Sequence, residues 1–129
     1  MRPYASGDLD DVVELCRAEG WRTYADAGRS RAAFSAPGVS AWVADLDGDV
    51  VGFCYVQSDT SIQAHLSLLV VADAHRHRGI ATAIVTRALN ESGATRLDLV
   101  TDASSGFYRS LPHRELSGFR VYGQAPGGG

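Results

Sequence analysis

A short basic segment in the middle of the chain has the residue types of an anion-binding site. Residues 72–82 read ADAHRHRGIAT and lead from an apolar run into a helical pattern. The first amides of a helix have no partner within the helix, and the helix dipole is positive at that end. Gly79 would let the backbone approach a ligand closely, and Arg76 and Arg78 would supply positive charge. This combination fits a pyrophosphate or a similar anion, and a solvated turn that starts a helix is the alternative.

Other reactive residue types form no recognisable site. His75 and His77 are two positions apart, but no cysteine or acid completes a familiar metal-ligand spacing around them. Cys16 falls on the apolar stripe of a helical pattern, and Cys54 lies among aromatic residues, so neither has a paired base. The chain also contains no lysine for a P-loop and no GxGxxG motif. We therefore expect no metal site, no thiol nucleophile and neither of these nucleotide-binding loops.

The elements that must position the basic segment follow from hydrophobic periodicity. Asp8 is expected to cap a first helix, whose apolar residues recur at helical spacing until Gly20. Alternating and apolar runs predict the strands, with the Asp47-Gly48 pair as a hairpin turn between two of them. The expected order is strand, helix, helix, three strands, helix, strand, helix, strand, over residues 2–4, 9–19, 29–34, 39–44, 50–57, 62–71, 79–92, 97–100, 104–111 and 119–122.

This order predicts an α/β fold with a mixed central sheet and helices on both faces. The three consecutive strands joined by tight turns should be antiparallel. The two strands on either side of the 79–92 helix should be parallel, because a right-handed crossover connects them. The basic segment would then lie where a buried strand ends and the crossover helix begins.

Composition limits the classes of protein to which the chain could belong. Its 129 residues suffice for one domain, expected over residues 1–122 with a flexible glycine-rich tail at 123–129. No apolar run approaches the roughly 20 residues that span a bilayer, no secretory signal precedes the first helix, and two cysteines fit a reduced compartment. We expect a cytoplasmic protein that binds no membrane. Its net charge of −3 also argues against nucleic acid.

The charge is divided unevenly along the chain. Residues 1–60 carry ten acids and five arginines, whereas residues 61–129 carry five acids and seven arginines. The first part therefore has a charge of −5 and the second of +2. We expect the basic part, residues 61–129, to hold a compact polyanion. We expect the acidic part, residues 1–60, to form much of the side of that binding site away from the polyanion.

The basic segment in its context resembles the signature of the GNAT superfamily of N-acetyltransferases. In that family an apolar strand and a short turn are followed by the motif [RQ]-x-x-G-x-[GA], in which x is any residue. The motif stands at the start of a helix. Arg76, Gly79 and Ala81 occupy those positions within LSLLVVADAHRHRGIATAIVTRAL. The order of elements matches over nearly the whole chain, and FYRSL followed by GFRVY is similar to the closing helix and strand of the family.

The resemblance implies acetyl-CoA as a co-substrate and no metal. The backbone of the 62–71 strand would bind the pantetheine arm, and the amides of the turn would wrap the pyrophosphate. An amine would attack the thioester directly, pass through a tetrahedral intermediate and release the CoA thiolate. The implied cofactor-binding residues are Leu69, Val70, Val71, Arg76, His77, Arg78, Gly79, Ile80, Ala81 and Thr82.

The resemblance also implies a general base and a general acid. Many family members place a carboxylate eleven positions before the Arg or Gln of the motif, and His65 stands there in this chain. Imidazole titrates near neutral pH and could accept the proton directly or through water. We expect His65 to share a strand face with Ser67, Leu69 and Val71, and that face to be turned toward the cofactor. A strand-end histidine bonded to a turn is the alternative. Tyr108 is the expected general acid, and a tyrosine packed in the core is the alternative.

The acceptor side is expected to form from residues 21–28 and 57–61. An aromatic wall and a carboxylate could bind a small amine there, or the same residues could serve only a packed loop and a solvated turn. These residues are Trp21, Tyr24, Asp26, Gln57 and Asp59. The chain departs from the family at Thr101, where an Asn is frequent, and in an insertion at residues 112–117. The leading hypothesis is acetylation of a small primary amine. A CoA-binding sensor without turnover and a peptide N-terminal acetyltransferase remain alternatives, and a homodimer stays open.

Overall fold

The computed structural model describes residues 1–101 and 105–123, so Ser104 of the expected helix cap and residues 124–129 of the expected tail lie outside the described residues. The described chain divides into two units, one from Met1 to Asp98 and one that begins at Leu99. None of the helices in the described ranges is long and apolar enough to cross a membrane. The helices and strands are β1 (Arg2–Pro3), α1 (Leu9–Ala18), α2 (Ala27–Phe34), β2 (Val39–Leu46), β3 (Asp49–Ser58), β4 (Gln63–Val71), α3 (Ile80–Glu91), β5 (Arg96–Asp98) and α4 (Ser105–Arg109).

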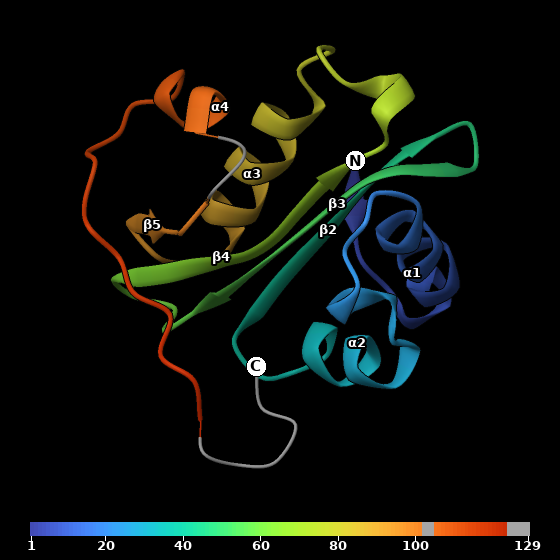
Figure 1. Cartoon of the computed structure of the whole chain (residues 1–129), viewed down its shortest axis with the longest axis horizontal. Coiled ribbons are helices and arrows are strands. Elements are labelled where there is room, and N and C mark those ends of the chain that lie inside the picture. The colour runs from blue at the N-terminus through green and yellow to red at the C-terminus, as the bar shows by residue number, and fades with distance from the viewer. Residues whose placement is uncertain (102–104, 124–129) are drawn as a thin grey trace. The chain divides into compact units, whose positions relative to one another are not determined.

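A five-stranded sheet runs through the first unit in the order β1-β2-β3-β4-β5 (Figure 1). The pairs β1–β2, β2–β3 and β3–β4 are antiparallel, and β4 pairs with β5 in parallel. At the β2–β3 turn Asp47 and Gly48 have φ angles of 53° and 91°, as a tight hairpin turn requires. The antiparallel meander and the parallel crossover through α3 were both predicted, and the structure confirms them.

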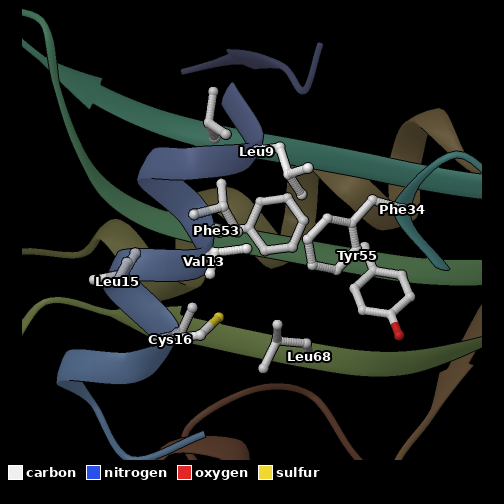
Figure 2. Packing of buried hydrophobic residues seen from close by; sticks show 11 residues of the cluster. Leu9, Val13, Leu15, Cys16, Phe34, Phe53, Tyr55 and Leu68 are labelled. Carbon is white, nitrogen blue, oxygen red and sulfur yellow. The ribbon is translucent and has the colours of Figure 1, made fainter. Parts of the chain in front are cut away.

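Helices cover both faces of the sheet (Figure 1). The apolar stripe of α1 packs on one face, where Leu9, Val13 and Cys16 lie against a cluster that includes Phe34 and Phe53 (Figure 2). Helix α2 contributes Phe34 to the same cluster. On the other face α3 buries its own apolar residues, Ile84, Val85 and Ala88. The predicted mixed α/β architecture is therefore confirmed, because α1 and α3 each bury an apolar stripe against one face of the sheet.

The start of the first helix differs from the prediction. Asp8 stands at the N-cap position of α1, but its side chain does not bond the amides of that helix. Its carboxylate instead accepts from the Ala5 amide at 2.9 Å and pairs with Arg2 at 2.8 Å. Arg2 also reaches Asp45 of β2 at 3.1 Å. Asp8 therefore ties the start of α1 to β1, and Arg2 links β1 to β2.

The predicted last strand is not formed. Residues 112–123, all described, contain no helix or strand. Phe119 and Val121, which alternate as strand residues would, are 90% and 89% exposed. Strand β5 also ends at Asp98, before the predicted Val100, and α4 ends at Arg109. A strand forms only when a neighbour accepts its backbone hydrogen bonds, and alternation along one segment says nothing about that neighbour.

Candidate active site

The turn between β4 and α3 is built from backbone in rare conformations. Asp73–His75 form one 3₁₀ turn, after which His77 has a φ of 63° and Gly79 a φ of 79°. A Cβ at Gly79 would meet no atom within 4 Å, so the left-handed backbone rather than crowding calls for glycine there. Gly79 is also the N-cap of α3. The turn therefore presents the unpaired first amides of a 12-residue helix, as the anion-site prediction required.

Arg76 is already engaged within the protein. Its guanidinium pairs with Glu19 at 2.9 Å and with Asp73 at 3.2 Å, and it donates to the carbonyl of Val71 at 3.3 Å. The Glu19 side chain, just past the end of α1, is only 12% exposed. These contacts tie the turn to α1. Anion binding by Arg76 stays a prediction, and so does binding by Arg78, whose guanidinium lies 3.3 Å from the His75 ring.

One edge of β4 is open beyond its first residues. Strand β5 pairs only with Gln63, Ala64 and His65. In residues 1–98, all of which the structure describes, no strand pairs with this edge from Leu66 to Val71. The opposite edge of β4 is paired with β3 along the same stretch. Backbone groups of this open edge, which includes Leu69, Val70 and Val71, have the form expected of a site for an extended amide-containing chain.

A bulge in β4 sets the side on which His65 lies. Gln57 pairs with His65 and Tyr55 pairs with Leu68, so one residue of β3 faces two of β4 between these pairs. Paired residues of an antiparallel ladder project to the same face. His65 therefore lies on the face of Leu68, which α1 and α2 cover, and its side chain is exposed. The expected shared face with Leu69 and Val71 is wrong, because the extra residue reverses the alternation; those two residues lie on the α3 face.

An open pocket of about 540 Å³ lies on the same face of the sheet as His65. We call it the tyrosine pocket, because Tyr24 and Tyr55 line it. Thr23 and Tyr24 come from the predicted acceptor loop, but the other lining residues do not: they are Arg29, Ala32 and Ala33 of α2 and Tyr55 of β3. The predicted turn at residues 57–61 does not line it.

Asp26 and Asp59, the two acids in the predicted acceptor loop and turn, accept hydrogen bonds from backbone amides instead. Asp59 accepts the amides of Ser61, Ile62 and Gln63 at 2.8, 2.7 and 3.1 Å, and these hydrogen bonds lower the pKa of its carboxyl. Asp26 caps α2 by accepting the Arg29 amide at 3.0 Å. Both carboxylates therefore serve local turns, which is the alternative interpretation of each. The charged lining residue of the pocket is Arg29.

Packing and hydrogen bonds fix the two tyrosines of the pocket. Tyr24 stacks on Phe34 with ring centroids 6.3 Å apart, and the buried Ser30 hydroxyl donates to the Tyr24 carbonyl at 2.8 Å. The Tyr55 hydroxyl donates to that of Tyr24 at 3.2 Å, and Tyr24 donates to the carbonyl of Ser67 at 3.2 Å. In Figure 2 the Tyr55 hydroxyl points away from the apolar cluster. The polar ends of both rings thus lie beside the bulge of β4.

Sequence reasoning missed Tyr55 and the α2 residues of the pocket. Tyr55 sits in an apolar strand and reads there as a core residue; it is in fact 3% exposed. The one available signal was strand alternation, which places Tyr55 on the same face as Gln57, the neighbour of His65 in the sheet. Nothing in the periodicity of α2 indicates that Arg29 borders a cavity.

Tyr108 lies in the second unit, on α4. Its side chain is half-buried, and its ring meets that of Phe107 edge-on at 4.9 Å between centroids. In the same unit Arg109 pairs with Glu115, which lowers the pKa of that carboxyl. The general-acid role of Tyr108 stays a prediction.

The remaining reactive groups form no second centre. Burial raises the pKa of Cys16 to about 11 and that of Cys54 to about 12, so both thiols stay protonated at neutral pH. Among the described residues, no group of three or more His, Cys, Asp or Glu side chains could hold a metal ion. The turn, the open β4 edge and the pocket lined by Tyr24 and Tyr55 are therefore the candidate site features of the first unit.

Comparison with known proteins assigns a family. The model of the acetyltransferase (GNAT) domain matches residues 37–111, more than half of the chain. An uncharacterized N-acetyltransferase of Chlorobaculum tepidum is 31% identical over 78 residues, which are 58% of this chain and 50% of that protein. The chain thus spans about half the length of that curated relative.

Solved structures show the same fold. Aminoglycoside N-acetyltransferase AAC(6')-Iy in complex with CoA superposes with a TM-score of 0.79 at 16% identity, over 95% of this chain and 92% of that one. Ribosomal-protein-alanine N-acetyltransferase from Brucella melitensis biovar Abortus 2308 gives 0.71 at 17% identity, over 93% and 95%. With the signature turn, the mixed sheet and the family match in agreement, the chain belongs to the GNAT family of acetyltransferases, whose general chemistry is acetyl transfer.

Proposed function

We propose that this protein is an N-acetyltransferase that moves the acetyl group of acetyl-CoA to a primary amine. The observation that carries the proposal is the turn before α3, where left-handed residues at His77 and Gly79 direct unpaired helix amides to one place. This turn follows directly on the open edge of β4. A ligand with a pyrophosphate and an amide-containing arm matches the two features together.

In this proposal the chain binds acetyl-CoA mainly through backbone. The amides from Arg76 to Thr82 bind the pyrophosphate, and the helix dipole of α3 adds favourable charge. The open β4 edge from Leu69 to Val71 binds the pantetheine arm as an added strand would bind. Acetyl-CoA supplies the activated acetyl thioester. Since Arg76 is held by Glu19 and Asp73, its role includes keeping the turn in shape.

His65 acts as the general base for the acceptor amine. Its position on the face of the tyrosine pocket supports this role, because the acceptor would then meet the base on the side opposite α3. The deprotonated amine forms the new N–C bond through a tetrahedral intermediate, and the C–S bond of the thioester breaks. Tyr108 donates a proton to the leaving CoA thiolate. The proton taken from the amine passes to His65, directly or through one water.

Two measurements on the purified protein test the function. Acetyl-CoA binding is followed by calorimetry, and thiol release is followed colorimetrically with a panel of primary amines. We expect binding together with thiol release from at least one acceptor. Binding without thiol release from any acceptor would favour the non-catalytic sensor, and absence of binding would overturn the assignment of the CoA site.

A variant of His65 tests the proposed base. For His65→Ala we expect turnover to fall on the order of 100-fold near neutral pH. The loss should shrink toward pH 9, where more of the acceptor amine is already neutral. His113→Ala is the matched control, since that histidine is exposed and bonds only the Leu111 carbonyl in the described residues. Unchanged turnover of His65→Ala from pH 6 to 9 would remove it from the mechanism.

A further inference from the structure

The tyrosine pocket has an unusual charge for a site that must accept an amine. A pocket for a simple ammonium group would be expected to contain a carboxylate. Here the charged lining residue is Arg29, and the rest of the wall is aromatic, apolar or hydroxylic. The wall consists of Thr23, Tyr24, Ala32, Ala33 and Tyr55. The pocket itself therefore offers a cation to its ligand.

The neighbouring acid does not cancel that charge. Asp26 Oδ1 accepts the Arg29 amide at 3.0 Å, and its Oδ2 is 4.0 Å from Arg29 Nε, at the limit of an ion pair. Both side chains are more than half exposed, so the attraction between them is screened by water. No other carboxylate pairs with Arg29 in the described residues. Its guanidinium thus keeps donors for a bidentate partner such as a carboxylate.

The wider surroundings of the pocket are also basic. The segment of residues 21–36, which contains the loop and α2, carries three arginines and one aspartate, a charge of +2. The acids of the first half of the chain are concentrated in α1 and in the β2–β3 hairpin instead. An acceptor with several ammonium groups would be repelled at this entrance, and one with a carboxylate would be attracted.

The Tyr55 hydroxyl of the pocket wall suits the amine. The Tyr55 hydroxyl uses its proton on Tyr24, so its oxygen retains a lone pair that can accept from an N–H group. The Tyr24 hydroxyl in turn reaches the Ser67 carbonyl within the β4 bulge, two residues beyond His65. An acceptor that bonds the Tyr55 hydroxyl has its nitrogen near the strand from which the proposed base projects.

We propose that the acceptor is a small amine that also carries a carboxylate, as a free amino acid does, and that Arg29 is the specificity-determining residue that binds this carboxylate. The inference rests on the proposed N-acetyltransferase function and names its substrate class. The amine lies toward the Tyr24–Tyr55 hydroxyls and the carboxylate toward α2, with the aromatic rings covering the apolar part. A peptide N-terminus has no such carboxylate beside its amine, and an aminoglycoside has none at all.

The test compares amino acids with the amines obtained by removing their carboxylates. The pairs are leucine and isopentylamine, phenylalanine and phenethylamine, and serine and ethanolamine. We expect kcat/KM to be on the order of tenfold higher for the better amino acid than for its amine. In Arg29→Gln this preference disappears through a higher KM for the amino acid, while the affinity for acetyl-CoA stays unchanged. Arg31→Gln is the matched control, because Arg31 is exposed on the same helix and does not line the pocket.

A binding measurement separates failure of this inference from failure of the proposed function. The binding of each amino acid and of its amine is measured by calorimetry, in the parent protein and in Arg29→Gln. Amino acids that bind more tightly than their amines in the parent protein, and equally in Arg29→Gln, support the inference even without turnover. Turnover of amines with no preference for the carboxylate partner, unaffected by Arg29→Gln, overturns the inference and leaves the N-acetyltransferase function intact. Equal binding of both members of every pair overturns it as well.

Discussion

The turn before α3 and the tyrosine pocket are built in opposite ways. The turn uses backbone: two left-handed residues, a helix N-terminus and an open strand edge, all within one continuous stretch of chain. The pocket uses side chains from three separate elements, the loop after α1, α2 and β3. Tyr24 and Tyr55, which shape it, are 31 residues apart in sequence.

This difference predicts which of the two regions tolerates substitution of its side chains. Backbone amides are present whatever the side chains are, so a backbone site needs only the conformations that present them. The ligand preference of a side-chain pocket, in contrast, changes when a residue of its wall is substituted. We infer that the turn serves the co-substrate shared by the family, and that the pocket carries whatever is particular to this protein.

Removing the support of the pocket should have the largest effect on stability. Phe34 is 3% exposed and its ring packs on those of Tyr24, Phe53 and Tyr55. We expect Phe34→Ala to lower the free energy of unfolding by about 3–5 kcal/mol, since it leaves a cavity under the pocket. Urea unfolding followed by circular dichroism measures this.

Phe119→Ala is the control for that substitution, because this phenylalanine is 90% exposed. It should change the free energy of unfolding by less than about 0.5 kcal/mol. Equal losses for the two variants would show that the wall of the pocket does not depend on the aromatic cluster.

Substituting the glycine of the turn should have a smaller and more selective effect. Gly79 and Gly48 have φ angles of 79° and 91°, and a Cβ at either would meet no atom within 4 Å. Alanine at each position should therefore cost about 1 kcal/mol of stability for the left-handed backbone alone. Only Gly79→Ala should also weaken acetyl-CoA binding, on the order of tenfold by calorimetry. Equal acetyl-CoA affinities of the two variants would contradict the backbone site.

The smallest effect is expected at Asp59, whose carboxyl bonds only backbone amides of its own turn. These bonds hold its pKa below the ordinary value of 3.8. A lowered pKa means that the carboxylate stabilises the fold above pH 3.8, and that this contribution is lost as the pH falls through the lower folded value. Asp59→Asn should therefore be less stable than the parent at pH 7, and the difference should close below pH 3.8.

Acceptor kinetics provide a second readout for Asp59→Asn. The KM for the acceptor amine should not change, because Asp59 does not line the pocket. A raised acceptor KM would return this residue to the acceptor site where sequence reasoning first placed it.

Predictions from sequence succeeded where the cause is local. The hairpin at Asp47-Gly48, the apolar stripe of α1 and the glycine at the start of α3 all formed as predicted. Each depends on conformational preferences or periodicity within a few residues. Predictions failed where contacts outside the periodic pattern decide: Asp8 bonds Arg2 and the Ala5 amide instead of the amides of α1, and residues 119–122 have a strand pattern without a strand.

The face of the sheet on which His65 lies shows most directly what could not be predicted from the sequence. Alternation along residues 62–71 was interpreted correctly as a strand, yet one extra residue in the β4 ladder moved His65 to the face opposite Leu69 and Val71. A bulge arises from how two strands register against each other, and neither strand alone encodes it.

By itself, then, the sequence determined the order of the elements from β1 to α4, the mixed α/β class and the backbone turn at residues 76–79, because helix and strand periods and left-handed glycine are properties of short segments. Only the tertiary structure decided that Arg29, Tyr24 and Tyr55 share one pocket, and on which side of the sheet His65 lies. Packing brings together residues that the chain keeps apart, and the composition of each segment carries no record of its neighbours in space.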